Sequence, residues 1–157
     1  EITADSMTTA NTTTDNSEEY TPCVKIYKGG VYAGLAFHGV PGGHEFTSFV
    51  LGLYNAAGPG QAMDEELRKQ IINITNQIDI KILVSLSCTM CPDLVIAAQH
   101  MAAVGETINA EVYDLSHLEE LKNKYNVMSV PCMVINDEQV HFGKKSLQQL
   151  LEIIGDK

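Results

Sequence analysis

The feature that most constrains this chain is the pair of cysteines Cys88 and Cys91, spaced C-x-x-C between two apolar patterns. The short run 80–86 is typical of a buried central strand, and residues 94–101 carry apolar side chains at helical spacing. At a helix N-terminus, free N–H groups and the helix dipole stabilise a cysteine thiolate. We therefore predict a redox dithiol in which Cys88 attacks and Cys91 resolves.

Two alternatives to a redox pair are a zinc site and inert core cysteines. Zinc needs four ligands, and neither a second cysteine pair nor suitably spaced histidines complete such a set in this sequence. Cys23 and Cys132 stand alone, so we expect them to be buried, structural and dispensable for thiol exchange. The sequence also has no G-x-G-x-x-G fingerprint, so we expect this chain to bind neither flavin nor nicotinamide itself.

Residues 61–157 carry alternating helix and strand patterns. Asp64 is a candidate N-cap, and Ser116-x-x-Glu119 and Ser146-x-x-Gln149 are candidate capping boxes. The order of elements matches the thioredoxin and glutaredoxin folds, so we predict an α/β thioredoxin fold, a mixed four-stranded sheet with helices on both faces. Helices are expected at 67–78, 94–101, 118–125 and 147–154, and strands at 80–86, 111–115, 132–135 and 139–142.

The preceding segment, 21–60, repeats only the last part of that order. Strands expected at 24–27 and 31–37 flank a Gly-Gly turn, and apolar residues at helical spacing follow from Phe46 to Tyr54. We interpret this ββα pattern as the truncated half of a second thioredoxin-like unit, packed on the complete one. Residues 1–20 are rich in Thr and lack Lys and Arg, so a disordered linker is expected there.

Pro131 precedes the apolar run 132–135, where its missing N–H is best tolerated. A cis bond between Val130 and Pro131 would expose nearby backbone groups for pairing with an extended partner. We expect Val130 and Pro131, together with Thr89 and Met90 between the two cysteines, to contact the substrate. An ordinary trans proline at a strand edge is the alternative.

Charge and hydropathy exclude two classes of partner. The net charge of −10, from 20 acidic and 10 basic residues, would repel nucleic acid. No apolar run approaches the roughly 18–20 residues that span a bilayer, so no membrane association is expected. No secretion signal is visible, and together with the C-x-x-C pair this predicts a cytoplasmic protein.

Three segments together carry a more specific resemblance. LSCTMCPD at 86–93, NVMSVP at 126–131 and GHEFTS at 43–48 are similar to the N-terminal domain of the alkyl hydroperoxide reductase family, in its F-type flavoprotein component. The resemblance covers residues 22–157 and implies two fused thioredoxin-like folds, of which only the second carries the C-x-x-C. By the same resemblance, Glu45 reaches from the first fold to the dithiol.

The resemblance also implies partners. Electrons are expected to come from a flavin-dependent dithiol reductase module that holds FAD and uses NAD(P)H, and to leave for a peroxiredoxin or another disulfide protein. The chain departs from the family in lacking the leading β-α-β half of the first fold, unless that half lies upstream of residue 1, and in having a linker-like segment in front. These departures suggest attachment to the C-terminus of a thioredoxin-reductase-like flavoprotein. The alternative function is a non-catalytic thioredoxin-like adaptor or redox sensor.

Overall fold

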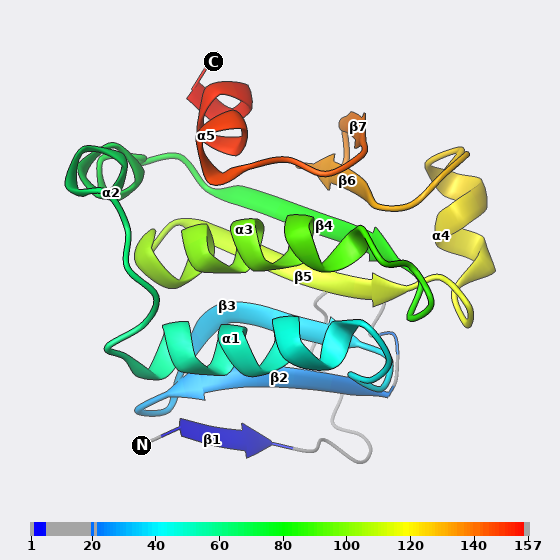
Figure 1. Ribbon diagram of the computed structural model, residues 1–157, viewed down its shortest axis with the longest axis horizontal. Helices are drawn as coiled ribbons and strands as arrows, with labels where there is room; N and C mark the ends of the chain where they lie inside the picture. Colours follow the sequence, from blue (N-terminus) through cyan, green and yellow to red (C-terminus); the bar gives the residue numbers. More distant parts are fainter. Residues whose placement is uncertain (1, 6–19, 21, 156–157) are drawn as a thin grey trace, which may run out of the picture.

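The computed structural model describes residues 2–5, 20 and 22–155, and these form one mixed sheet with helices on both faces (Figure 1). The strands are β1 (Ile2–Asp5), β2 (Cys23–Lys28), β3 (Val31–His38), β4 (Ile78–Val84), β5 (Ile108–Asp114), β6 (Cys132–Ile135) and β7 (Gln139–Phe142). The helices are α1 (Glu45–Ala57), α2 (Glu65–Ile72), α3 (Cys91–Val104), α4 (Glu119–Lys124) and α5 (Leu147–Gly155).

The C-terminal part of the chain has the predicted thioredoxin fold. Strands β4 and β5 are parallel and joined by α3, while β6 and β7 are an antiparallel hairpin paired to the other edge of β4. The ββα half, made of β2, β3 and α1, packs against this unit along the edge of its sheet and through the contact of α1 with α3. Strand β3 pairs in parallel with β5, with His38 opposite Tyr113, and the sheet continues in the order β1-β2-β3-β5-β4-β6-β7.

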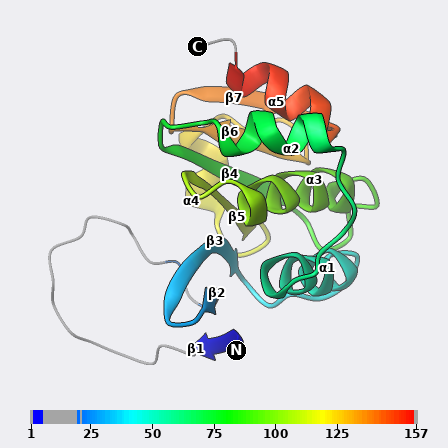
Figure 2. The same ribbon diagram turned by 90° about the vertical axis from the view of Figure 1, so that its left-hand side faces the viewer.

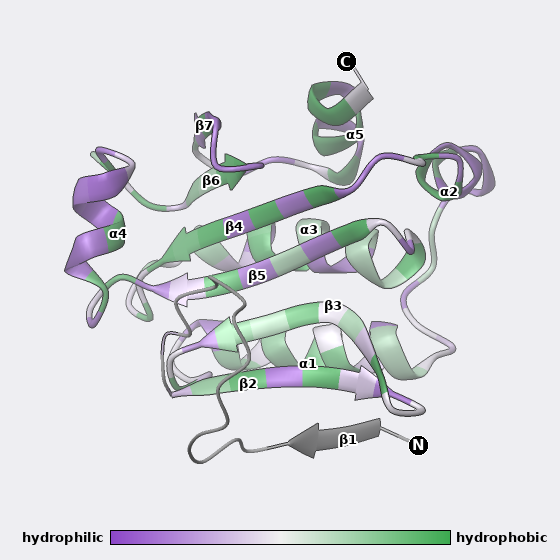
Figure 3. Cartoon of the chain, turned by 180° about the vertical axis from the view of Figure 1, so that it is seen from behind, coloured by the Kyte–Doolittle hydropathy of each residue, from purple (hydrophilic) through white to green (hydrophobic). Residues whose placement is uncertain are grey.

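The sheet separates two apolar cores. Helices α1 and α3 lie side by side on one face, where α3 also contacts α2 and α5, and α4 lies on the other face (Figure 2). Strand β4 serves both cores, because Ile82 packs beneath α3 and Leu83 packs towards α4. This double burial explains why the last three residues of β4, 82–84, are all apolar and fully buried. Viewed from behind, β3 and β4 are mainly hydrophobic and α4 is mainly hydrophilic (Figure 3).

The helix ends test the capping predictions. Asp64 caps α2 through bonds from the N–H groups of Glu66 and Leu67, as predicted. Ser146 and Gln149 form the predicted reciprocal capping box at α5. The Ser116 box is wrong. Both the N–H and the hydroxyl of Ser116 bond to the carboxylate of Asp114, and this local turn delays the start of α4.

Other boundaries also differ from the sequence prediction. Strand β4 ends at Val84 rather than at residue 86, and β5 begins at Ile108 rather than at residue 111. Helix α2 ends at Ile72, with Asn73 as its C-cap, because Ile78 belongs to β4 and its apolar character serves that strand. Within the expected linker 1–20, Ile2–Asp5 forms β1 and pairs antiparallel with β2. The pairing satisfies backbone groups that the edge of β2 would otherwise leave without strand partners. Residues 6–19 of that expectation lie outside the described residues.

Within the described residues, no helix is both long and apolar enough to cross a bilayer.

Candidate functional site

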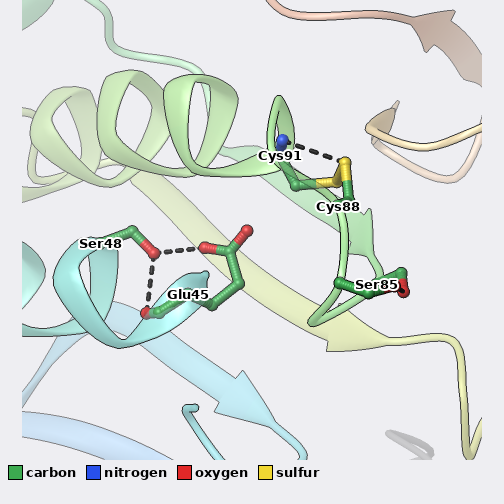
Figure 4. The surroundings of a disulfide bond; sticks show 6 residues. Glu45, Ser48, Ser85, Cys88 and Cys91 are labelled. Atoms are coloured by element: carbon green, nitrogen blue, oxygen red, sulfur yellow. Dashed lines mark hydrogen bonds between the residues drawn. A yellow bond between two sulfur atoms is a disulfide. The ribbon is translucent and has the colours of Figure 1, made fainter. Parts of the chain in front are cut away.

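Cys88 and Cys91 form a disulfide at the junction between β4 and α3 (Figure 4). Their Cα atoms are 5.5 Å apart. Cys91 is the first residue of α3 and is fully buried, whereas Cys88 is half-buried in the preceding turn and Thr89 and Met90 are exposed. A partner protein can therefore reach Cys88 but not Cys91, which is the asymmetry expected of an attacking and a resolving sulfur.

The N-terminus of α3 is directed at Sγ of Cys88. The backbone N–H of Cys91 donates a hydrogen bond of 3.1 Å to Sγ of Cys88. The N–H of Cys88 donates in turn to the carbonyl of Ser85 at 2.9 Å, which fixes the turn at the end of β4. When the disulfide is reduced, the same Cys91 N–H and the dipole of α3 are in place to stabilise a thiolate at Cys88.

Glu45 is the first residue of α1 and its side chain is completely buried. The carboxyl group extends from α1 towards the first turn of α3 and Cys91 (Figure 4). Oε2 accepts a hydrogen bond from the hydroxyl of Ser48, and Oε1 has no hydrogen-bond partner among the described residues. Burial raises the pKa of Glu45, and the bond from Ser48 opposes that rise.

A close contact between two loops brings Glu45 to the dithiol. The N–H of His44 donates a hydrogen bond of 3.0 Å to the carbonyl of Leu86, two residues before Cys88. Gly43 makes the approach possible, since a Cβ there would lie 2.5 Å from that carbonyl oxygen and the residue has φ +54°. The ββα half therefore supplies one wall of the site.

The Val130–Pro131 peptide is cis, as the sequence suggested. Leu83 near the end of β4 pairs with Cys132 at the start of β6, so Pro131 lies at the same end of the sheet as the turn that carries Cys88. Pro131 is buried, and Val130 packs against the same core as Cys88. The structure thus brings the Val130–Pro131 segment and the cysteine turn to one end of the sheet.

A second polar cluster lies along β3 and β5. His38 and Glu111 form an ion pair of 2.8 Å between Nε2 and Oε2. Tyr32 donates to Oε1 of Glu111 at 2.6 Å, Tyr113 donates to Oε2 at 3.0 Å, and the His38 ring stacks on that of Tyr113. Sequence analysis missed this cluster. No local pattern reports the pairing of β3 with β5, which brings His38 and Glu111 together.

In this cluster the charged forms of His38 and Glu111 stabilise each other. Burial disfavours a charged His38, but its contact with Cys23 and its bond to Glu111 outweigh this effect and raise the pKa of His38 to about 9. Burial likewise disfavours a charged Glu111, yet the bonds from His38 and Tyr32 lower its pKa to about 2. The imidazolium–carboxylate pair is therefore the stable form at neutral pH.

The remaining cysteines differ from each other. Cys132 is completely buried, as predicted, and burial raises the pKa of its thiol to about 11. Cys23 was predicted to be buried, but it is half-exposed and its Sγ lies 4.0 Å from Nε2 of His38. Within the described residues, no group of three or more His, Cys, Asp or Glu side chains is placed to hold a metal ion.

Comparisons with known proteins agree with this geometry. The thioredoxin-domain family matches residues 78–155. A protein named NADH dehydrogenase from Ferdinandcohnia aciditolerans is 30% identical over 150 residues, which cover 96% of this chain and 29% of that protein. The F component of alkyl hydroperoxide reductase in Pseudomonas aeruginosa is 32% identical over 138 residues, covering 88% of this chain and 26% of that protein.

A solved structure extends the match to three dimensions. The NTD_N/C domain of alkylhydroperoxide reductase from Enterococcus faecalis superimposes with a TM-score of 0.82 and 40% identity, covering 86% of this chain and 65% of that one. The chain spans only about a quarter to a third of the length of the two curated relatives named above, covering 29% of the first and 26% of the second.

Proposed function

Because this chain carries a thioredoxin domain and is homologous to the N-terminal domain of the F component of alkyl hydroperoxide reductase, we propose that it relays electrons by thiol–disulfide exchange. The donor would be a flavin-dependent dithiol reductase, and the acceptor a peroxiredoxin or another disulfide protein. The observation that carries the proposal is the Cys88–Cys91 disulfide, with one sulfur accessible, the other buried, and a helix N–H on the accessible one.

The exchange begins with the reduced chain. The Cys88 thiolate, stabilised by the Cys91 N–H, attacks one sulfur of the acceptor disulfide. That S–S bond breaks, a mixed disulfide forms at Cys88, and the second acceptor sulfur leaves as a thiolate that takes a proton. This first step needs only the half-exposed Cys88, which suits a large protein acceptor.

The second step releases the acceptor. The Cys91 thiol gives its proton to the carboxylate of Glu45, and the resulting thiolate attacks Sγ of Cys88. The bond between Cys88 and the acceptor breaks, the acceptor leaves fully reduced, and the Cys88–Cys91 disulfide is restored. Two electrons have then passed to the acceptor. The reductase returns the chain to the dithiol by the reverse sequence of exchanges.

Contacts around the dithiol would orient the acceptor. Thr89 and Met90 are exposed beside Cys88, and Val130 lies at the same end of the sheet. We propose that these residues and Pro131 form the docking surface for an extended segment of the acceptor.

We further propose that FAD and NAD(P)H bind to the reductase module rather than to this chain. The name NADH dehydrogenase of one relative supports a nicotinamide-linked donor. We propose that this chain acts in the cytoplasm, where reducing conditions keep thiols reduced and suit such a donor.

A coupled assay tests the relay. The chain is mixed with a thioredoxin-reductase-like flavoprotein, NADH or NADPH, and an oxidised peroxiredoxin, and nucleotide oxidation is followed by absorbance. Turnover should depend on the concentration of this chain and disappear in Cys88→Ser. Nucleotide oxidation without reduction of the acceptor, or a full rate in Cys88→Ser, would contradict the proposal. Reversible oxidation of Cys88 and Cys91 without turnover would favour the adaptor or sensor.

A further inference from the structure

Ser48 is a buried polar residue with a specific relationship to Glu45. It lies one turn further along α1 and is completely buried. Its hydroxyl is placed to donate to the backbone carbonyl of Glu45, at 2.9 Å, and to the side-chain Oε2 of the same residue. The only side-chain hydrogen bond to Glu45 among the described residues therefore comes from within α1.

This contact makes the two carboxyl oxygens of Glu45 unequal. Oε2 is held by Ser48, whereas Oε1 has no partner among the described residues. Figure 4 shows the carboxyl group between Ser48 on one side and the first turn of α3 on the other. Burying an oxygen without a hydrogen-bond donor costs free energy, so a neighbouring group must hold the Glu45 carboxyl in this orientation. Ser48 is placed to impose it.

We propose that Ser48 is a positioning residue that holds the Glu45 carboxyl with Oε1 directed at the dithiol. The inference rests on the proposed thiol exchange and extends it to a residue that does not touch the sulfurs. By donating to Oε2, the hydroxyl also favours the carboxylate over the carboxylic acid. Ser48 thus sets the direction of the group that faces Cys91 and opposes the rise in its pKa that burial causes.

Other titratable groups near this end of α1 are few. The cysteine turn and α3 contribute Cys88, Cys91 and Asp93, and Asp93 lies 3.3 Å from Nζ of Lys144. His44, the N-cap of α1, is exposed. Strands β2 and β3 contribute apolar residues such as Ile26 and Phe37 to the core beneath α1. Asp114 at the end of β5, beside Gly39, is a second buried carboxyl on this side of the sheet, and its Oδ1 accepts hydrogen bonds from the N–H and the hydroxyl of Ser116. Glu45 is the buried carboxyl at the start of α1, and the Glu45→Gln variant identifies its own contribution to the profile.

The test follows the alkylation rate of Cys88 in the reduced 157-residue chain between about pH 5 and pH 9. Iodoacetamide is the probe, and modification is read on the Cys88 peptide by mass spectrometry so that Cys23 does not interfere. Wild type, Ser48→Ala, Glu45→Gln and the double variant form a cycle. Thr47→Ala, an exposed neighbour on the same helix turn, is the matched control.

In wild type, the rate should show an inflection from Glu45 below that of the thiol. Ser48→Ala should move the carboxyl inflection to higher pH, because the hydrogen bond that favours the charged form is gone. Between the two inflections, alkylation should become about threefold faster, since a neutral Glu45 no longer opposes the Cys88 thiolate. Thr47→Ala should match wild type, and Ser48→Thr, which keeps the hydroxyl, should restore the profile.

The cycle separates positioning from a structural role. In the Glu45→Gln background, Ser48→Ala should leave the profile unchanged. An equal change in both backgrounds, or a Ser48→Ala profile identical to that of wild type, would overturn the proposal. If Ser48→Ala does not fold, the same comparison is made with Ser48→Gly. Alkylation needs neither electron donor nor acceptor, so failure of the relay itself would leave this result readable.

Discussion

The N–H of His44 lies 3.0 Å from the carbonyl oxygen of Leu86, and this hydrogen bond joins the two halves of the molecule beside the dithiol. His44 occupies the N-cap position of α1 directly before Glu45, while Leu86 lies in the turn at the end of β4, two residues before Cys88. The bond therefore fixes the start of α1 relative to the start of α3. The segment made of β2, β3 and α1 thereby brings the Glu45 carboxyl to the side of the first turn of α3.

Removal of the resolving sulfur should stop the exchange halfway. In Cys91→Ser, Cys88 can still attack the acceptor, but no second thiolate releases it. A mixed disulfide with the acceptor should accumulate and be visible by non-reducing electrophoresis and mass spectrometry. Cys88→Ser should form no adduct. If Cys88→Ser keeps turnover and Cys91→Ser yields no adduct, the two roles are reversed.

Neutralising Glu45 should make the dithiol more acidic. A carboxylate beside Cys91 opposes formation of a nearby thiolate, so Glu45→Gln should lower the pKa of the Cys88 thiol. Turnover at neutral pH should nevertheless fall, because the proton acceptor for Cys91 is lost. Thiolate absorbance near 240 nm against pH measures the first effect. An unchanged titration curve would assign Glu45 a purely structural role at the start of α1.

Crowding at Gly43 should separate the two halves. Gly43→Ala combines an unfavourable positive φ with a Cβ placed 2.5 Å from the carbonyl oxygen of Leu86. We expect a loss of about 2 kcal/mol in the free energy of unfolding, measured with urea, and a Cys88 alkylation profile that approaches that of Glu45→Gln. Gly29→Ala is the matched control, since Gly29 has a similar φ of +58° but no atom within 4 Å of the added Cβ. Equal losses in both variants would show that the contact with Leu86 is unimportant.

The His38–Glu111 pair should make stability depend on pH. The pKa of His38 is raised from 6.5 to about 9, so its contribution is complete below pH 6.5 and is lost as the pH rises through about 9. The pKa of Glu111 is lowered from 4.5 to about 2, so its contribution is present above pH 4.5 and is lost as the pH falls through about 2. Urea midpoints in wild type should therefore decline between pH 6.5 and pH 9.

His38→Gln provides the comparison for that slope. The substitution leaves the partly buried Glu111 carboxylate without its cation, which should cost about 1–3 kcal/mol of unfolding free energy at neutral pH. The decline in the alkaline range should become shallower, because the group that titrates there is gone. A wild-type urea midpoint that stays constant through this range would contradict the raised pKa.

The two unpaired cysteines should not take part in exchange. Cys132 is buried with a thiol pKa raised to about 11, and Cys23 lies on a strand rather than at a helix N-terminus. Replacing both by Ala should leave disulfide reductase activity within a few-fold of wild type, at a cost of about 1 kcal/mol for the cavity at Cys132. Near-total loss of activity in a folded double variant would reveal a second redox centre.

Local patterns were sufficient for much of the fold. The apolar run before Cys88 and the helical spacing after Cys91 predicted the strand–turn–helix that carries the disulfide. The hairpin of β6 and β7 was predicted residue for residue, because an apolar strand and an alternating one flank a polar turn of three residues. At Ser116 the local pattern predicted a capping box that does not form, because Ser116 bonds instead to Asp114 two residues earlier.

Glu45 combines a position that the local sequence predicts with a role that depends on tertiary contacts. Its sequence position predicted only a residue at the start of a helix, and its link to the dithiol came from resemblance. The contact of His44 with Leu86 and the bond from Ser48 are what give this carboxyl group its burial and direction. The bond from Ser48 has no sequence signature of its own, because a serine one turn after a glutamate is common on exposed helices.

The sequence by itself therefore determined the elements and the dithiol, since strand and helix periodicity, capping residues and the C-x-x-C spacing all act within a few residues. The tertiary structure alone decided that β3 pairs with β5, that Glu45 meets the dithiol, and that His38 meets Glu111. These contacts join residues far apart in the chain. Strand register and helix packing set them, and both depend on how the whole apolar surface is buried at once.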